Sequence, residues 1–114
     1  MFSNLMKEIE QKITQSSNTE ISNYITKCID ETMTLLKNDT KIASSEKEDA
    51  IESLANIQAT FYDYVNSAQL GTQGLKNVIN ELLEYKEKYE FILMMIDGFM
   101  HVIPIFQILL MFVS

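Results

Sequence analysis

Residues 91–114 read FILMMIDGFMHVIPIFQILLMFVS, and this apolar segment governs how the rest of the chain must be organised. All 9 lysines and all but one of the 16 acidic residues precede it, so Asp97 is its single formal charge. A segment this apolar has to be removed from water, either into a lipid bilayer or into the interior of a protein. The two solutions imply different functions.

The composition limits the class of protein. A chain of 114 residues has the length of one domain, and its 3 glycines and 1 proline are too few for a turn-rich β architecture. The net charge is -7 and arginine is absent. Binding to nucleic acid is therefore not expected, because such binding depends on basic side chains that neutralise phosphates. Mimicry of nucleic acid is also disfavoured, because the acidic residues are mixed with lysines at helical spacing. We expect an all-α protein.

The single cysteine and the first residues bear on the compartment. Cys28 has no partner for an intramolecular disulfide, which fits a reducing environment, and it falls on an apolar stripe as a small buried residue would. The start of the chain, MFSNLMKEIEQK, is too charged for a secretory signal peptide. We therefore expect the cytoplasm or the cytoplasmic face of a membrane, and not classical secretion.

Apolar residues at steps of three and four predict an antiparallel bundle of four to five helices, formed by residues 1–90 and with a long last helix that runs into the apolar segment. A short amphipathic helix is expected over 3–15. A second is expected to start at a capping box formed by Ser17 and Glu20, and to end at Asn38-Asp39.

The next two helices are predicted from the same kinds of signal. Ser45 and Glu48 have the spacing of a second capping box, and the third helix is expected to end near Gly71. The fourth is expected to be capped by Thr72, to carry the charged run ELLEYKEKYE on its surface, and to continue into the apolar segment as one long last helix.

Three structures are considered for the apolar segment. As one continuous membrane helix its 24 residues would extend about 36 Å, enough for a hydrocarbon core of about 30 Å. If Asp97-Gly98 breaks the helix, the remaining 99–113 is too short to cross, and would form a core helix, lie at an interface or insert conditionally. In that helix Pro104 would produce a kink. A third alternative is a β-hairpin that turns at Asp97-Gly98, although its flanks lack clean alternation.

The residues that form the membrane or core segment share large apolar side chains. They are Phe91, Ile92, Leu93, Ile96, Phe99, Val102, Ile103, Ile105, Phe106, Ile108, Leu109, Leu110, Phe112 and Val113.

On a continuous helix, Glu90, Asp97, His101 and Pro104 would share one narrow stripe. We treat its three polar residues, Glu90, Asp97 and His101, as a polar seam. Asp97 and His101 are four residues apart and could satisfy each other. They are too few to make a metal site and lack a nucleophile for catalysis. Histidine commonly changes charge between pH 5 and 8, so the seam is also a candidate pH sensor. Membrane binding across that range in wild type and His101→Ala would test this role.

The sequence thus predicts a bundle over 1–90 and an apolar C-terminal helix over 91–114. The leading functional hypothesis is a non-enzymatic, membrane-associated interaction protein, anchored or conditionally inserted through this helix, with a pore-forming or lysis protein as a subtype. The alternative is a soluble interaction module, or a subunit of an obligate complex, whose C-terminal helix is the buried core. A protein partner or self-association is expected, and no cofactor, metal, nucleic acid or small-molecule substrate.

Overall fold

The computed structural model describes residues 18–67 and 71–114, and every regular element in these residues is a helix. The elements are α2 (Asn18–Asn38), α3 (Ser44–Asn66), α4 (Thr72–Lys88), α5 (Glu90–Met95), the 3-10 helix η1 (Phe99–His101) and α6 (Ile103–Val113). The predicted all-α class is confirmed. The helix expected over 3–15 and the cap expected at Ser17 lie outside the described residues.

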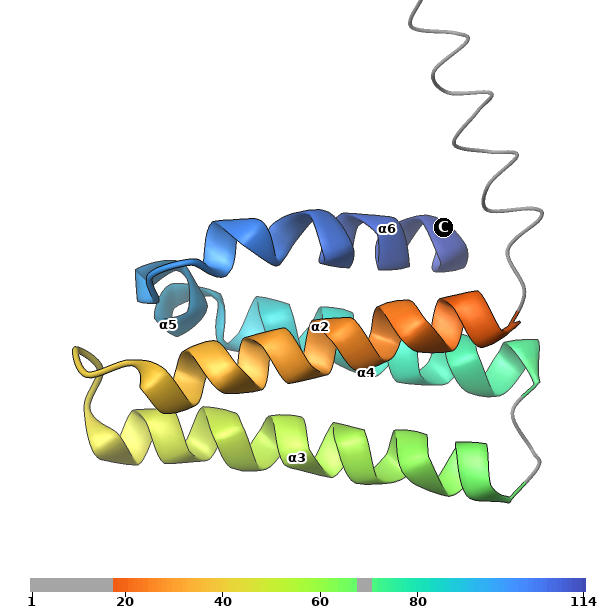
Figure 1. Cartoon of the computed structure of the whole chain (residues 1–114), viewed down its shortest axis with the longest axis horizontal. Helices are drawn as coiled ribbons and strands as arrows, with labels where there is room; N and C mark the ends of the chain where they lie inside the picture. Colours follow the sequence, from red (N-terminus) through yellow and green to blue (C-terminus); the bar gives the residue numbers. More distant parts are fainter. Residues whose placement is uncertain (1–17, 68–70) are drawn as a thin grey trace, which may run out of the picture.

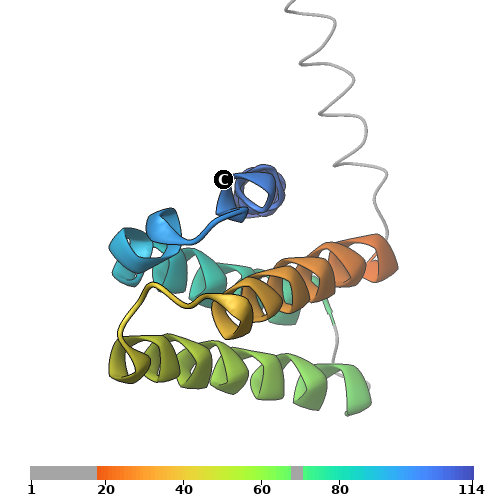
Figure 2. The same cartoon turned by 60° about the vertical axis from the view of Figure 1, so that its left-hand side comes forward.

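The four longer helices form a bundle in which α2 and α4 lie side by side in the middle (Figures 1 and 2). α3 packs against one side of this pair, and α6 packs against the other. Successive long helices run in opposite directions, and the C-terminus lies near the start of α2 (Figure 1). The apolar C-terminal segment therefore supplies the fourth long helix of the bundle.

Apolar spacing explains which helices occupy the middle of the bundle. The buried residues of α2 are Ile21, Ile25, Cys28, Ile29, Thr32 and Leu36, and those of α4 are Leu75, Val78, Ile79, Leu82 and Tyr85. They recur at threes and fours, so each helix presents a continuous apolar stripe. α3 buries fewer side chains, namely Ala50, Leu54 and Phe61, as expected for a helix in an outer layer.

The end of α2 follows the sequence prediction, whereas the two helix starts differ from it. The Asp39 carboxylate accepts hydrogen bonds from the backbone N–H groups of Lys41 and Ile42, at 3.0 and 2.8 Å, and so forms the local turn that ends the helix. α3 begins one residue before Ser45, and Thr72 is the first residue inside α4. Neither helix has a side-chain cap hydrogen bond. The predicted caps at Ser45 and Thr72 are therefore wrong.

The predicted single long last helix is divided in the structure. α4 ends at Lys88, and after α5 the residue Ile96 is extended, with ψ 130°. Gly98 has φ 90°, the left-handed conformation that glycine adopts most readily. The β-hairpin alternative is wrong, because helices flank the Asp97-Gly98 turn on both sides.

Pro104 also has a different role from the one expected. It lies in the first turn of α6, where the lack of a backbone N–H is tolerated, so it starts this helix and does not kink it.

Candidate interaction surface

The inner side of α6 is part of the core. Ile105, Phe106 and Leu109 are buried against α2 and α4. The ring of Phe106 lies 5.9 Å from that of Phe99, and the ring of Phe112 lies 6.4 Å from that of Tyr24 on α2. These aromatic and aliphatic contacts fix α6 along the α2–α4 pair.

The residues predicted to form the membrane or core segment are not equally covered. Leu93, Ile96, Phe99, Val102, Ile105, Phe106 and Leu109 are buried. Ile92, Ile103, Ile108, Phe112 and Val113 are half-buried, and Phe91 and Leu110 are exposed. The segment is therefore core on one side and surface on the other.

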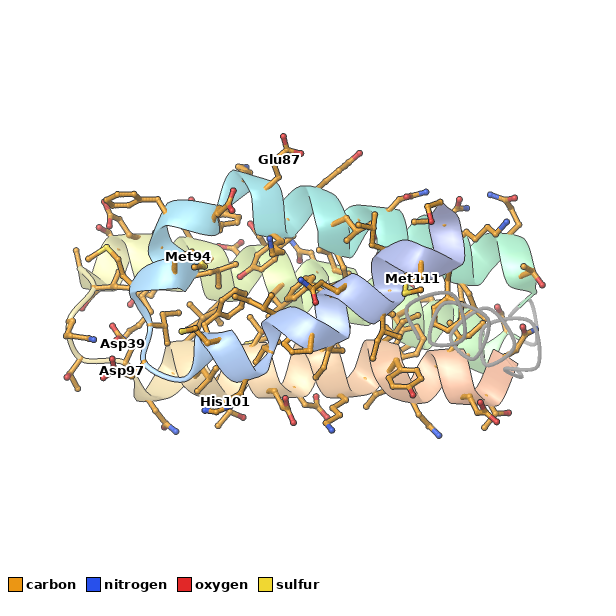
Figure 3. All side chains as sticks on the ribbon, turned by 90° about the horizontal axis from the view of Figure 1, so that it is seen from above. Asp39, Glu87, Met94, Asp97, His101 and Met111 are labelled. Carbon is orange, nitrogen blue, oxygen red and sulfur yellow. The ribbon has the colours of Figure 1, made fainter. Side chains whose placement is uncertain are left out.

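The exposed side of α5, η1 and α6 is unusually apolar. We define the C-terminal apolar surface as Phe91, Met94, Met95, Met100 and Leu110, which are 81, 53, 48, 76 and 50% exposed. Only two other large apolar side chains in the described residues, Tyr62 and Val65, are comparably exposed. α6 carries no charged residue. Seen from the α6 side, the labelled Met94 and Met111 lie over the same face of the bundle (Figure 3).

The three residues of the predicted polar seam lie in three different settings. Glu90 starts α5, and its carboxylate is 4.0 Å from the Lys86 ammonium group. Asp97 pairs with Lys41 at 2.8 Å, which joins the α5–η1 turn to the α2–α3 loop. His101 ends η1 and lies toward α2 (Figure 3). The division of the helix thus separates residues that a continuous helix would have aligned.

A groove of about 370 Å³ lies between α2 and the connection from α5 to α6. Its lining residues are Asp30, Glu31, Thr34, Leu35, Gly98, His101 and Val102. A Cβ atom at Gly98 would lie 3.2 Å from a methyl carbon of Leu35, so glycine permits the close approach of the connection to α2. The groove is therefore lined by the same glycine that has the left-handed backbone conformation.

Two buried titratable groups in the described residues, Cys28 and Tyr85, have raised pKa values. Burial raises the pKa of the Cys28 thiol, and the nearby Glu31 carboxylate adds to this effect. Burial likewise raises the pKa of Tyr85, whose hydroxyl donates a 2.9 Å hydrogen bond to the backbone oxygen of Ala50. Both groups therefore keep their protons at neutral pH. Residues 18–67 and 71–114 contain no cluster of three metal-ligating side chains.

Two further findings concern similarity to known proteins and the length of the helices. The chain matches no protein-family model, no curated protein and no solved structure. Among the residues that the structure describes, no helix combines the length and hydropathy needed to cross a bilayer.

The sequence did not single out the groove or the pairing of Lys41 with Asp97. Asp30 and Glu31 look like ordinary surface residues of an amphipathic helix, and 56 positions separate Lys41 from Asp97. The glycine at the break was visible in the sequence, but its closeness to Leu35 depends on how the helices pack.

Proposed function

We propose that the protein is a non-enzymatic helical interaction module that binds a protein partner through the C-terminal apolar surface. The observation that carries the proposal is the exposure of five large apolar side chains on one short stretch of chain. Exposed apolar patches on soluble domains commonly mark binding surfaces. Methionine side chains, which supply three of the five, adapt well to different partner surfaces.

A second copy of this chain is the simplest partner to consider. Two copies that each carry a net charge of -7 repel one another over most approaches. α6 has no charged residue, so approach through this helix brings the fewest like charges together. The uncharged outer side of α6 therefore favours self-association as well as binding to a different protein.

The packing of α6 favours a mode of binding in which this helix stays in the bundle while its outer side contacts the partner. Its 11 residues extend about 16 Å as a helix, roughly half the thickness of a hydrocarbon core. Insertion of the kind used by pore-forming proteins would require α6 to expose Ile105, Phe106 and Leu109. Each such side chain contributes about 1.5–3 kcal/mol when it is buried. If α6 stays packed in the bundle, its outer side can contact a partner without the loss of this free energy of burial.

Attachment to the surface of a membrane is the second candidate function. The specific observation in its favour is that α6 is uncharged and exposes Leu110, as a helix lying in a lipid interface would. The acidic character of the chain argues for neutral lipids over anionic ones. In this second candidate function, the protein associates with a membrane, and α5, η1 and α6 lie on the surface of the bilayer.

The two candidates are tested with Leu110→Glu and, as a matched control, Val65→Glu. Val65 is 44% exposed but lies on α3, on the opposite side of the bundle. Light scattering over a wide range of concentration measures self-association, and co-sedimentation with phosphatidylcholine vesicles measures membrane attachment.

We expect the wild type and Val65→Glu to associate in solution, and Leu110→Glu to remain monomeric. Vesicle binding that is lost in Leu110→Glu would instead support the membrane candidate. If Leu110→Glu and Val65→Glu behave alike in both measurements, the C-terminal apolar surface mediates neither self-association nor membrane attachment.

A further inference from the structure

The groove between α2 and the α5–α6 connection has an apolar floor. Val102 is 1% exposed and Leu35 is half-buried, and both line the groove. Gly98 adds no side chain to fill it. A volume of about 370 Å³ is near the lower end of the range for ligand pockets, so the groove suits a small group or one long side chain.

The rim of the groove is polar and acidic. Asp30 and Glu31 contribute carboxylates, Thr34 a hydroxyl group and His101 an imidazole. Among residues 18–67 and 71–114, neither carboxylate forms an ion pair or a hydrogen bond through its side chain. Lys27 precedes Asp30 by one turn on α2 and pairs with neither of them. The rim therefore offers acceptors that a ligand could use.

We infer that this groove holds a lysine or arginine side chain of the bound protein partner. Such a side chain has an apolar stem and a charged end, so the stem can lie on Leu35 and Val102 while the charge meets the carboxylates. The hydroxyl oxygen of Thr34 is a further acceptor for its N–H groups. An anionic or purely apolar ligand would not match both the floor and the rim.

The groove and the C-terminal apolar surface are neighbours along the chain. Met100 belongs to that surface, and the next two residues, His101 and Val102, line the groove. One partner segment can therefore cover Met100 with an apolar side chain and place a basic side chain in the groove. This inference rests on the proposed function and narrows the partner to a segment with basic and apolar residues side by side.

The test uses n-butylammonium as a stand-in for a lysine side chain, and n-butanol as its uncharged counterpart. Both are titrated into the full-length protein while NMR follows the methyl groups of Leu35 and Val102. We expect saturable shifts with n-butylammonium and none with n-butanol. Added salt should weaken the binding, because the rim is open to water.

Two double variants with equal net charge separate the groove from general acidity. Asp30→Asn/Glu31→Gln changes the rim, whereas Asp63→Asn/Glu87→Gln changes two exposed carboxylates elsewhere; Glu87 lies on α4, away from His101 (Figure 3). The rim variant should bind n-butylammonium about twofold to thirtyfold more weakly, because it loses two exposed carboxylates that could pair with the ammonium group. The control variant should bind it like the wild type.

Three results would overturn the inference: shifts that never saturate, equal shifts with n-butanol, or equal behaviour of the two double variants. Leu110 does not line the groove. Leu110→Glu should therefore keep its affinity for n-butylammonium even if it loses association with a partner. The inference about the groove and the proposed function can thus be contradicted independently of each other.

Discussion

The hydroxyl group of Tyr85 on α4 donates a 2.9 Å hydrogen bond to the backbone oxygen of Ala50 on α3, inside the core. Both residues are buried, so water cannot replace the bond if it is lost. Tyr85→Phe should lower the free energy of unfolding by about 0.5–1.5 kcal/mol. Urea denaturation measures this change. Tyr62→Phe is the control, because Tyr62 is 46% exposed, and equal effects of the two changes would contradict the prediction.

Adjacent leucines on α6 should respond very differently to truncation. Leu109 is fully buried, whereas Leu110 is 50% exposed. Leu109→Ala should reduce the free energy of unfolding by about 2–5 kcal/mol, through lost apolar contacts and the cavity left behind. Leu110→Ala should change it by no more than about 0.5 kcal/mol. Thermal or urea unfolding measures the stability of the two variants. Similar decreases in the free energy of unfolding would mean that α6 does not pack in the orientation described.

Removal of residues 91–114 should unfold the remaining bundle. Those residues supply seven buried side chains, from Leu93 to Leu109, and each contributes about 1.5–3 kcal/mol. Their sum of about 10–21 kcal/mol equals or exceeds the stability of about 5–15 kcal/mol that is usual for a whole domain. Circular dichroism and size-exclusion chromatography of a chain ending at Glu90 provide the measurement. A folded, monodisperse truncation would instead establish residues 1–90 as an independent bundle.

Substitution of Gly98 should destabilise the turn between α5 and η1. The left-handed φ of 90° is unfavourable for alanine by roughly 1–2 kcal/mol, and the new Cβ would also crowd a methyl group of Leu35. Gly98→Ala should therefore lower the free energy of unfolding by at least about 1 kcal/mol. Gly71→Ala is a suitable control, since φ is -93° there and no atom lies within 4 Å of the added Cβ. An equally stable Gly98→Ala protein would contradict the described turn.

The buried thiol of Cys28 should make the protein less stable in alkali. Burial and then Glu31 raise its pKa, so the folded state keeps a proton that the unfolded state releases above pH about 8.5. The stabilisation from the neutral thiol is thus complete below that pH and declines by about 1.4 kcal/mol per pH unit above it. Tyr85, whose pKa is also raised, adds a further decline above pH about 10.

Urea unfolding at pH 7, 9 and 10 measures the decline expected for Cys28. Cys28→Ala should lower stability at all three values through lost packing, but should show a shallower fall between pH 9 and 10. An identical fall in the wild type and in Cys28→Ala would show that another group is responsible.

Local sequence signals predicted the helices that form the middle of the bundle. The spacing of Ile21, Ile25 and Ile29 requires one buried stripe, and Asp39 ends α2 through hydrogen bonds to residues two and three positions later. Such features depend on neighbours along the chain, so the residues themselves specify them. The two helix starts at Ser44 and Thr72 were harder to predict, because the backbone there begins without a side-chain cap.

The candidate site depended instead on contacts between distant segments. Leu109 and Leu110 are identical in chemistry, and only the packing of α6 on α2 and α4 makes one of them core and the other surface. The groove is likewise lined by both Glu31 and His101, which are 70 positions apart in the sequence. Hydropathy identifies the segment that must be covered, but it does not say which side remains open.

Because α6 is buried on one side and exposed on the other, mutations on its two sides should have different phenotypes. In a saturation mutagenesis experiment, polar replacements of Phe106 or Leu109 should deplete the cellular level of the protein through misfolding and degradation. Polar replacements of Met100 or Leu110 should leave that level intact and yet remove whatever fitness benefit the protein provides. Positions that lie one residue apart should therefore fall into opposite phenotypic classes. Such separation-of-function alleles would allow the biological role to be traced without first knowing the partner.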